Sequence, residues 1–115
     1  MTDRERTKDW IEIVPGIHRR TTAVGEKMYQ MIVFLEKGAV MPAHQHVHEQ
    51  IASVISGKVR FIIDGKPRDV GAAEVVMLKS NVPHGVEVLE DSWIIDTFTP
   101  IREDLVEQDR KRQAT

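Results

Sequence analysis

Short apolar runs, separated by turn residues roughly every eight to twelve positions, constrain the fold of this chain more than any other feature. The runs are rich in Val and Ile, whose branched side chains fit the pleated surface of a sheet. Before position 100, no stretch repeats its apolar residues with the period of a helix. The sequence therefore predicts an all-β domain, an antiparallel sandwich or barrel.

Turn residues mark where the predicted strands end. Asp64-Gly65 lies between two apolar runs and predicts a tight hairpin, because Asp and Gly tolerate the positive φ angles of primed turns. Further turn signals are Pro15-Gly16, Ser56-Gly57, Gly71, Asn81-Val82-Pro83 and Glu90-Asp91. The expected strands are Trp10–Val14, Ile17–Thr22, Met28–Glu36, Ile51–Ser56, Lys58–Ile63, Pro67–Val70, Val75–Leu78, Gly85–Leu89 and Trp93–Phe98.

The two ends of the chain differ from this middle region. Residues 1–9 are polar and charged, so we expect a flexible N-terminal segment and neither a signal peptide nor a membrane anchor. Residues 102–115 alternate charges and have few apolar positions, which predicts a charged C-terminal tail or a short helix. Between them we expect one β-barrel domain over residues 10–101.

Composition narrows the classes of function. The chain has no cysteine, so it offers no disulfide, thiolate metal site or cysteine nucleophile, and this absence fits a cytoplasmic location. Its formal net charge is -2, whereas a phosphate-binding surface needs an excess of Lys and Arg. We therefore expect a small-molecule substrate, with no nucleic-acid partner and no membrane partner.

Histidines gather in the segment Gly38-Ala-Val-Met-Pro-Ala-His44-Gln-His46-Val-His48-Glu49-Gln50. Alternate side chains of an extended strand share a face, so His44 and His46 can reach one point in space. Neutral imidazole is the commonest metal ligand, and His84 adds a third one from elsewhere in the chain. This donor set suits Zn, Ni, Fe or Mn better than Ca or Mg. The sequence therefore predicts a site for one divalent transition metal.

The same segment resembles the first motif of the cupin superfamily. That motif reads Gly, five residues, His-x-His, three or four residues, Glu, six residues, Gly. Gly38, His44, His46, Gln50 and Gly57 fall on it, with Gln50 in the place of the Glu.

The second cupin motif is matched more weakly. Gly71 and His84 agree with it, whereas Lys79 and Asn81 replace its Pro and its second Gly. Together the two motifs imply a cupin double-stranded β-helix, a jelly-roll barrel. They also imply that His44, His46, Gln50 and His84 hold the metal in its mouth.

The carboxamide of Gln50 matters for the chemistry. It removes no charge from a divalent ion, so the metal stays a stronger Lewis acid than it would beside a carboxylate. The set is also less like the two-His-one-carboxylate triad of non-haem iron oxygenases. This favours polarising a carbonyl or enolic oxygen over activating molecular oxygen.

Two neighbouring residues compete for the metal. His48 shares the alternation of His44 and His46 and could replace one of them, and Glu49 competes with Gln50. The cupin motif leaves His48 outside, and the six residues between Gln50 and Gly57 favour Gln50. We expect His48 at the rim of the site.

The last predicted strand places Asp96 and Phe98 on one side, two residues apart. A carboxylate among apolar residues is costly unless it is paired or functional. This segment resembles the small cupins of the KdgF type, which act in pectin and alginate breakdown and convert 4,5-unsaturated uronates into open-chain keto forms. The resemblance implies that Asp96 moves a proton, Arg102 binds the substrate carboxylate and Phe98 faces the sugar ring. Alternatively, Asp96 forms an internal salt bridge with Arg102 or Lys79, and Phe98 is a core residue.

The function that these features favour is a metal-dependent lyase- or isomerase-type reaction on an anionic uronate. An Fe(II)-dependent cupin dioxygenase and a non-enzymatic small-molecule-binding cupin are the alternatives. Small cupins commonly pair, and the apolar strand Trp10–Val14 offers an edge to cover. We therefore expect a homodimer.

Overall fold

Eight strands and one helix follow each other along residues 10–114, the part of the chain that this computed structural model describes. The flexible segment expected at residues 1–9 lies outside the described residues. The elements are β1 (Ile11–Val14), β2 (Ile17–Val24), β3 (Tyr29–Leu35), β4 (Val40–His44), β5 (Glu49–Ile63), β6 (Lys66–Gly71), β7 (Val75–Leu78), β8 (His84–Thr99) and α1 (Glu103–Ala114).

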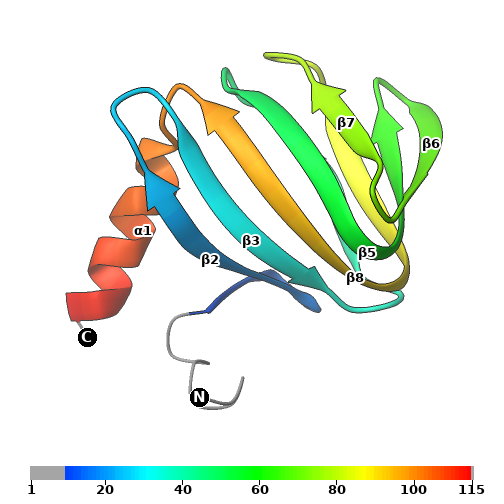
Figure 1. Ribbon diagram of the computed structural model, residues 1–115, viewed down its shortest axis with the longest axis horizontal. Helices are drawn as coiled ribbons and strands as arrows, with labels where there is room; N and C mark the ends of the chain where they lie inside the picture. Colours follow the sequence, from blue (N-terminus) through cyan, green and yellow to red (C-terminus); the bar gives the residue numbers. More distant parts are fainter. Residues whose placement is uncertain (1–9, 115) are drawn as a thin grey trace.

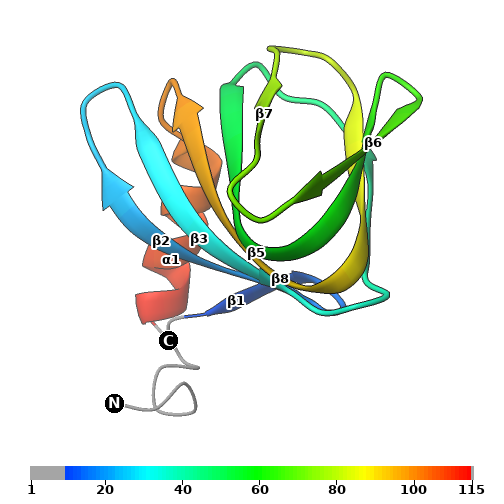
Figure 2. The same cartoon turned by 45° about the vertical axis from the view of Figure 1, so that its right-hand side comes forward.

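The strands form one antiparallel sheet that curls into a barrel (Figure 1). Its order is β1-β2-β3-β8-β5-β6, with β4 paired to β8 and β7 paired to β5. The long strands β5 and β8 pair over most of their length and curve together through the base of the barrel (Figure 2). The prediction of an all-β jelly-roll barrel with a short C-terminal helix is confirmed.

The core fills the inside of this barrel because side chains alternate between its two faces. Along β3, Tyr29, Met31, Val33 and Leu35 are buried, while the residues between them are only half-buried. Burying a large apolar side chain contributes roughly 1.5–3 kcal/mol. The alternation therefore fixes which face of each strand looks inward.

In two places, consecutive predicted strands form one continuous strand in the structure. Ser56-Gly57 was expected to be a turn, but β5 continues through it with shifts of register against β8. Gly57 has φ +90°, and β8 passes so close that a Cβ there would overlap Ser92 Oγ and the Asp91 carbonyl oxygen. The glycine therefore bends the strand and does not reverse it. The turn expected at Glu90-Asp91 is likewise part of β8.

Strand β4 was not predicted. Its side chains are mostly exposed and it contains Pro42, so it shows neither alternation nor a run of branched residues. Proline is tolerated at a strand edge, where no ladder hydrogen bond is needed from its nitrogen. The hairpin at Asp64-Gly65, in contrast, is confirmed, with φ angles of 50° and 80°.

A buried arginine fastens α1 to the barrel. Arg19 is 1% exposed and donates hydrogen bonds to Asp109 Oδ1 at 3.0 Å and Gln108 Oε1 at 2.9 Å. It also donates to the Tyr29 hydroxyl at 3.3 Å, and Leu105 adds a buried apolar contact. The helix is thus part of the folded unit. Within residues 10–114, no helix is long and apolar enough to cross a membrane.

Gly57→Ala should destabilise the fold by about 3 kcal/mol or more, because a left-handed φ costs ~1–2 kcal/mol and overpacking adds a similar amount. Gly38→Ala is the matched control, since Gly38 has φ +88° and a Cβ there would meet nothing within 4 Å. Urea unfolding of both variants measures the difference. Equal losses would contradict a close approach of β8 to Gly57.

Candidate metal centre

Three histidines converge at the open end of the barrel, which lies at the top of Figure 1, where β5 begins and β7 ends. His44 ends β4 and is the register partner of His84, which begins β8. His46 lies in the loop between β4 and β5. One ring nitrogen from each histidine lies within 4.8 Å of the others, so these groups could hold a metal ion. The strand geometry invoked for His46 was therefore wrong, although its convergence with His44 is found.

The same backbone contact orients all three rings. Their Nδ1 atoms lie next to carbonyl oxygens, at 3.1 Å from Pro42 for His44, 2.9 Å from His48 for His46 and 3.0 Å from Val82 for His84. A carbonyl only accepts, so each Nδ1 carries the hydrogen and each neutral ring has its lone pair on Nε2.

The Nε2 atoms have the environment of metal donors. Those of His46 and His84 are buried and have no hydrogen-bond partner. Buried polar atoms without partners are rare in folded proteins, and ligand histidines are commonly held through their other nitrogen in this way. The chain thus fits a metal ion at this position.

Burial keeps two of the rings uncharged. Together with the charge of Arg102, burial lowers the pKa of His46 to about 4. Burial also lowers the pKa of His84 below its ordinary value. Neutral imidazole is the form that binds a metal, so protons compete weakly for these two rings near pH 7.

Gln50 and Asp96 form a buried pair beside the histidines. Gln50 Nε2 donates to Asp96 Oδ1 at 2.9 Å, which leaves the Gln50 carbonyl oxygen available as a ligand. Burial raises the pKa of the Asp96 carboxyl to about 6, against the opposing effects of the Gln50 hydrogen bond and Arg102. The pair faces the interior because Gln50 and Asp96 both occupy inward positions of their strands.

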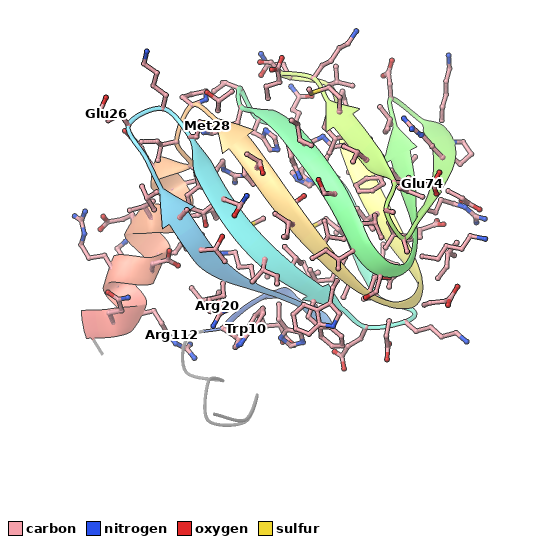
Figure 3. The ribbon with its side chains drawn as sticks, in the orientation of Figure 1. Trp10, Arg20, Glu26, Met28, Glu74 and Arg112 are labelled. Carbon is pink, nitrogen blue, oxygen red and sulfur yellow. The ribbon has the colours of Figure 1, made fainter. Side chains whose placement is uncertain are left out.

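These polar groups form one wall of a small cavity. Its volume is about 70 Å³, which is room for roughly two water molecules at about 30 Å³ each. His44, His84, Gln50 and Asp96 line it together with an apolar floor made by Ile13, Ile17, Met31, Val33, Leu35, Met41, Phe61, Val86 and Ile94. Only a few atoms of a ligand can therefore reach below the histidines, and the rest stays at the mouth. Glu26 and Met28 lie on the β2–β3 turn at this end (Figure 3).

Arg102 and Phe98 lie next to the histidines in an arrangement that the sequence did not reveal. Phe98 is 2% exposed, with its ring centroid 5.7 Å from that of His46. The Arg102 guanidinium lies 4.8 Å above the Phe98 ring and binds both carboxylate oxygens of Asp104, at 3.0 and 2.9 Å. Arg102 thus pairs with Asp104, and in the part of the chain described here no ion pair joins it to Asp96. The contact of Phe98 with a ligand stays a prediction.

The family assignment agrees with this geometry. The cupin domain family matches residues 31–94, a range that contains His44, His46, Gln50 and His84. The pectin degradation protein KdgF of Dickeya dadantii is 35% identical over 99 residues, which is 84% of this chain and 90% of the relative. The chain is a cupin of the KdgF family.

Two solved structures superpose on this cupin over 84% of its chain. KdgF from Halomonas sp. superposes with a TM-score of 0.80 and 33% identity, over 84% of this chain and 90% of that one. An RmlC-like cupin from Shewanella frigidimarina NCIMB 400 gives a TM-score of 0.78 and 27% identity, over 84% and 86% of the two chains.

The two competing ligands of this cupin are not members of the three-histidine cluster. The Nε2 atom of His48 lies 3.2 Å from the carbonyl oxygen of Ile101, to which it donates. Its Nδ1 is buried without a partner, but His48 does not belong to the group of nitrogens within 4.8 Å of one another. Glu49 is exposed, because alternation along β5 turns it away from the buried Gln50. Lys79 is also exposed.

Sequence reasoning missed two features of this cupin, one at the site and one beneath its helix. Asp104 was not considered as the partner of Arg102, although only one residue separates them. Arg19 was not considered as a buried residue, although its place between Ile17 and Thr21 on the inward face of β2 was a signal. Both links depend on the helix, whose position the sequence does not specify.

Zn²⁺ or Ni²⁺ should raise the Tm of the protein after treatment with a chelator, because a ligand at 100 times its Kd adds about 2.7 kcal/mol to stability. His46→Ala should lose most of this metal-induced shift, measured against its own metal-free Tm by calorimetry. His48→Ala is the matched control and should keep the shift. A loss in His48→Ala, with retention in His46→Ala, would place His48 and not His46 in the metal sphere.

Asp96→Asn should stabilise the metal-free protein at pH 7.5 and have little effect at pH 4. The raised pKa means that stability is fully present below about pH 4 and is lost as the carboxyl ionises through about pH 6. With a shift of about two units, the gain is on the order of 1–3 kcal/mol. Urea unfolding across this pH range measures it, with the exposed Asp64→Asn as control. A difference that does not vary with pH would contradict a buried carboxyl that titrates near pH 6.

Proposed function

We propose that this cupin converts 4,5-unsaturated uronates into their open-chain keto forms with the help of a divalent transition metal. The observation that carries the proposal is the shared cavity, in which Asp96 lies with Gln50, His44 and His84. The name of the Dickeya dadantii relative, a pectin degradation protein, supports a uronate as the substrate.

The metal would be held by His44, His46, Gln50 and His84, as Zn, Ni, Fe or Mn. Bound there, such an ion supplies Lewis acidity that polarises substrate oxygens. The protein's own part is to keep the histidine lone pairs aimed at one point through their backbone hydrogen bonds, and to limit water in the cavity.

The reaction needs only proton transfers. In the ring form of the substrate, the C1 hydroxyl loses its proton and the bond between C1 and the ring oxygen breaks. This gives a C1 aldehyde and a C5 enolate, which becomes a ketone when C4 takes up a proton. Product and substrate are isomers, so no oxidant or reductant takes part.

Asp96 is the proposed proton carrier. It is 8% exposed and is held by the Gln50 amide, so it can accept a proton from the C1 hydroxyl and return one to C4 with little competition from water. Because the cavity is small, the reacting atoms of the substrate would enter it and the remaining groups would stay at the mouth.

Arg102 is the proposed contact for the substrate carboxylate. Its guanidinium is fixed over Phe98 and beside Asp104, close enough to the site for its charge to lower the pKa of His46. A guanidinium binds a carboxylate through two parallel hydrogen bonds, which would orient the ring of the substrate. Phe98 would support Arg102 from below and give the site an apolar wall.

The test is product formation from a 4,5-unsaturated uronate, followed by NMR in the absence of oxygen with the metal-loaded protein. We expect acceleration over the spontaneous reaction, and a loss of about 100-fold or more in Asp96→Asn, because general acid–base groups contribute ~10²–10⁴. The exposed Asp64→Asn should keep the full rate. Lack of acceleration with any of the divalent metals would reject this substrate class, and a requirement for oxygen would point to a dioxygenase.

A further inference from the structure

A polar groove lies between β2 and the last turns of α1, and we call it the β2–α1 groove. Its volume is about 370 Å³, within the range of about 300–1,000 Å³ that is usual for small-molecule sites. Strand β1 pairs with β2 only as far as Arg19, the register partner of Ile11, so within residues 10–114 the rest of β2 has one unpaired edge. The polar residues that line the groove are Arg20, Thr21, Thr22, Asp109, Arg112 and Gln113.

The β2–α1 groove is separate from the candidate metal centre. It shares no lining residue with the cavity below the histidines. Asp104, the partner of Arg102, lies in the first turn of α1, whereas Arg112 lies in the last turn. At a rise of about 1.5 Å per residue, Asp104 and Arg112 are roughly 12 Å apart along the helix axis. A ligand in this groove would therefore bind beside the barrel and not in its mouth.

Arg20 gives the groove a positive charge. Its guanidinium lies 5.3 Å from the centroid of the Trp10 ring, and no carboxylate of residues 10–114 forms an ion pair with it. Stacking on an aromatic ring holds a guanidinium in place and leaves the N–H groups at its rim able to donate hydrogen bonds. Arg20 is thus a held cation with donors available for a ligand.

Arg112 adds a second positive charge from the helix. Figure 3 shows Arg112 on the same side of the molecule as Trp10 and Arg20, next to the last turn of α1. The helix is fixed in this place, because the buried Arg19 donates hydrogen bonds to Asp109 at 3.0 Å and to a neighbouring glutamine. Two arginines therefore line one groove from two elements that are held against each other.

Asp109 is the acidic residue that lines the groove, and its charge is already compensated. Its carboxylate accepts hydrogen bonds from the Arg19 guanidinium and from the Thr21 hydroxyl. The groove and the buried group behind it thus combine three arginines, at positions 19, 20 and 112, with one carboxylate. This excess of positive charge favours an anion over a cation as the ligand.

We propose that the β2–α1 groove is a second ligand site of this cupin, which binds a small polyhydroxylated anion through a carboxylate or phosphate group. Arginine suits both groups, because its planar guanidinium donates two parallel hydrogen bonds to their oxygens. Thr22 and Gln113 are exposed in the same groove and offer a hydroxyl and an amide to the hydroxyl groups of the ligand. Such a ligand would bridge β2 and α1, the two elements that Arg19 already joins.

Calorimetric titration of the metal-free protein tests the proposal with galacturonate, glucose 6-phosphate and uncharged galactose. We expect saturable binding of at least one of the two anions and no binding of galactose. Binding of galacturonate alone would identify the group as a carboxylate, and binding of glucose 6-phosphate alone would identify it as a phosphate. Arg20→Gln and Arg112→Gln should each weaken the binding by about tenfold or more, because hydrogen bonds to charged groups are among the stronger ones in proteins.

Arg110→Gln is the matched control. It removes the same charge from the same helix, but Arg110 does not line the groove and pairs with Glu107 at 3.3 Å. This variant should bind the anion as the unchanged protein does, and an equal loss would mean that net charge alone attracts the anion. Absence of saturable binding at millimolar concentration would also overturn the proposal. So would binding that is lost in Arg102→Gln and retained in Arg20→Gln, because it would place the anion at the mouth of the barrel.

An NMR titration of the unchanged protein does not depend on any variant. The anion should shift the amide signals of Thr22 and Gln113 and the indole N–H signal of Trp10, which lie in or next to the groove. Shifts confined to the region of Gln50 and His84 would overturn the proposal. Neither measurement follows the conversion of a substrate, so both outcomes are independent of whether uronates are the substrate.

Discussion

The pairing of β5 with β8 controls where Gln50, Asp96 and His84 lie. The start of β5 pairs with the end of β8, which brings Gln50 and Asp96 together, since Ala52 and Asp96 are register partners. The end of β5 pairs with the start of β8, where His84 begins the strand and faces His44 of β4. One ladder therefore joins two groups of side chains that are far apart in sequence. The bend at Gly57 allows this, because it lets both strands cross the base of the barrel and return to the mouth.

Burial away from water then determines the charge state of the site's side chains. His46, His84 and Asp96 are buried to different degrees, and in each case burial favours the neutral form, which lowers the pKa of the two histidines and raises that of Asp96. The backbone carbonyls fix the tautomer of each neutral ring, because they accept a hydrogen bond from Nδ1 and leave the lone pair on Nε2. The result is a set of donors that needs little rearrangement to accept a cation. The positive charge of Arg102 reaches the same groups from the side of Phe98.

The sequence predicted those features that depend on local patterns. The glycine and histidine spacing of the cupin motif identified His44, His46 and Gln50, and the alternation of Val and Ile identified most strands. The prediction failed where one local sequence pattern is compatible with two different structures. Ser56-Gly57 reads as a turn in sequence, but the neighbouring strand makes it a bend. His46 reads as a strand residue, although β4 ends at His44. Contacts between distant elements, such as Arg19 with Asp109, follow from register and docking, which no local pattern encodes.

The buried arginine beneath α1 makes the stability of the barrel depend on the C-terminal helix. Arg19 has no access to water and relies on Asp109 and Gln108 for two of its hydrogen bonds. A chain that ended before Gln108 would leave a buried guanidinium without these partners, and breaking a buried ion pair costs about 3–5 kcal/mol. The segment that looks most dispensable by composition therefore supplies partners to a buried side chain of the barrel, and shortening it would destabilise the barrel.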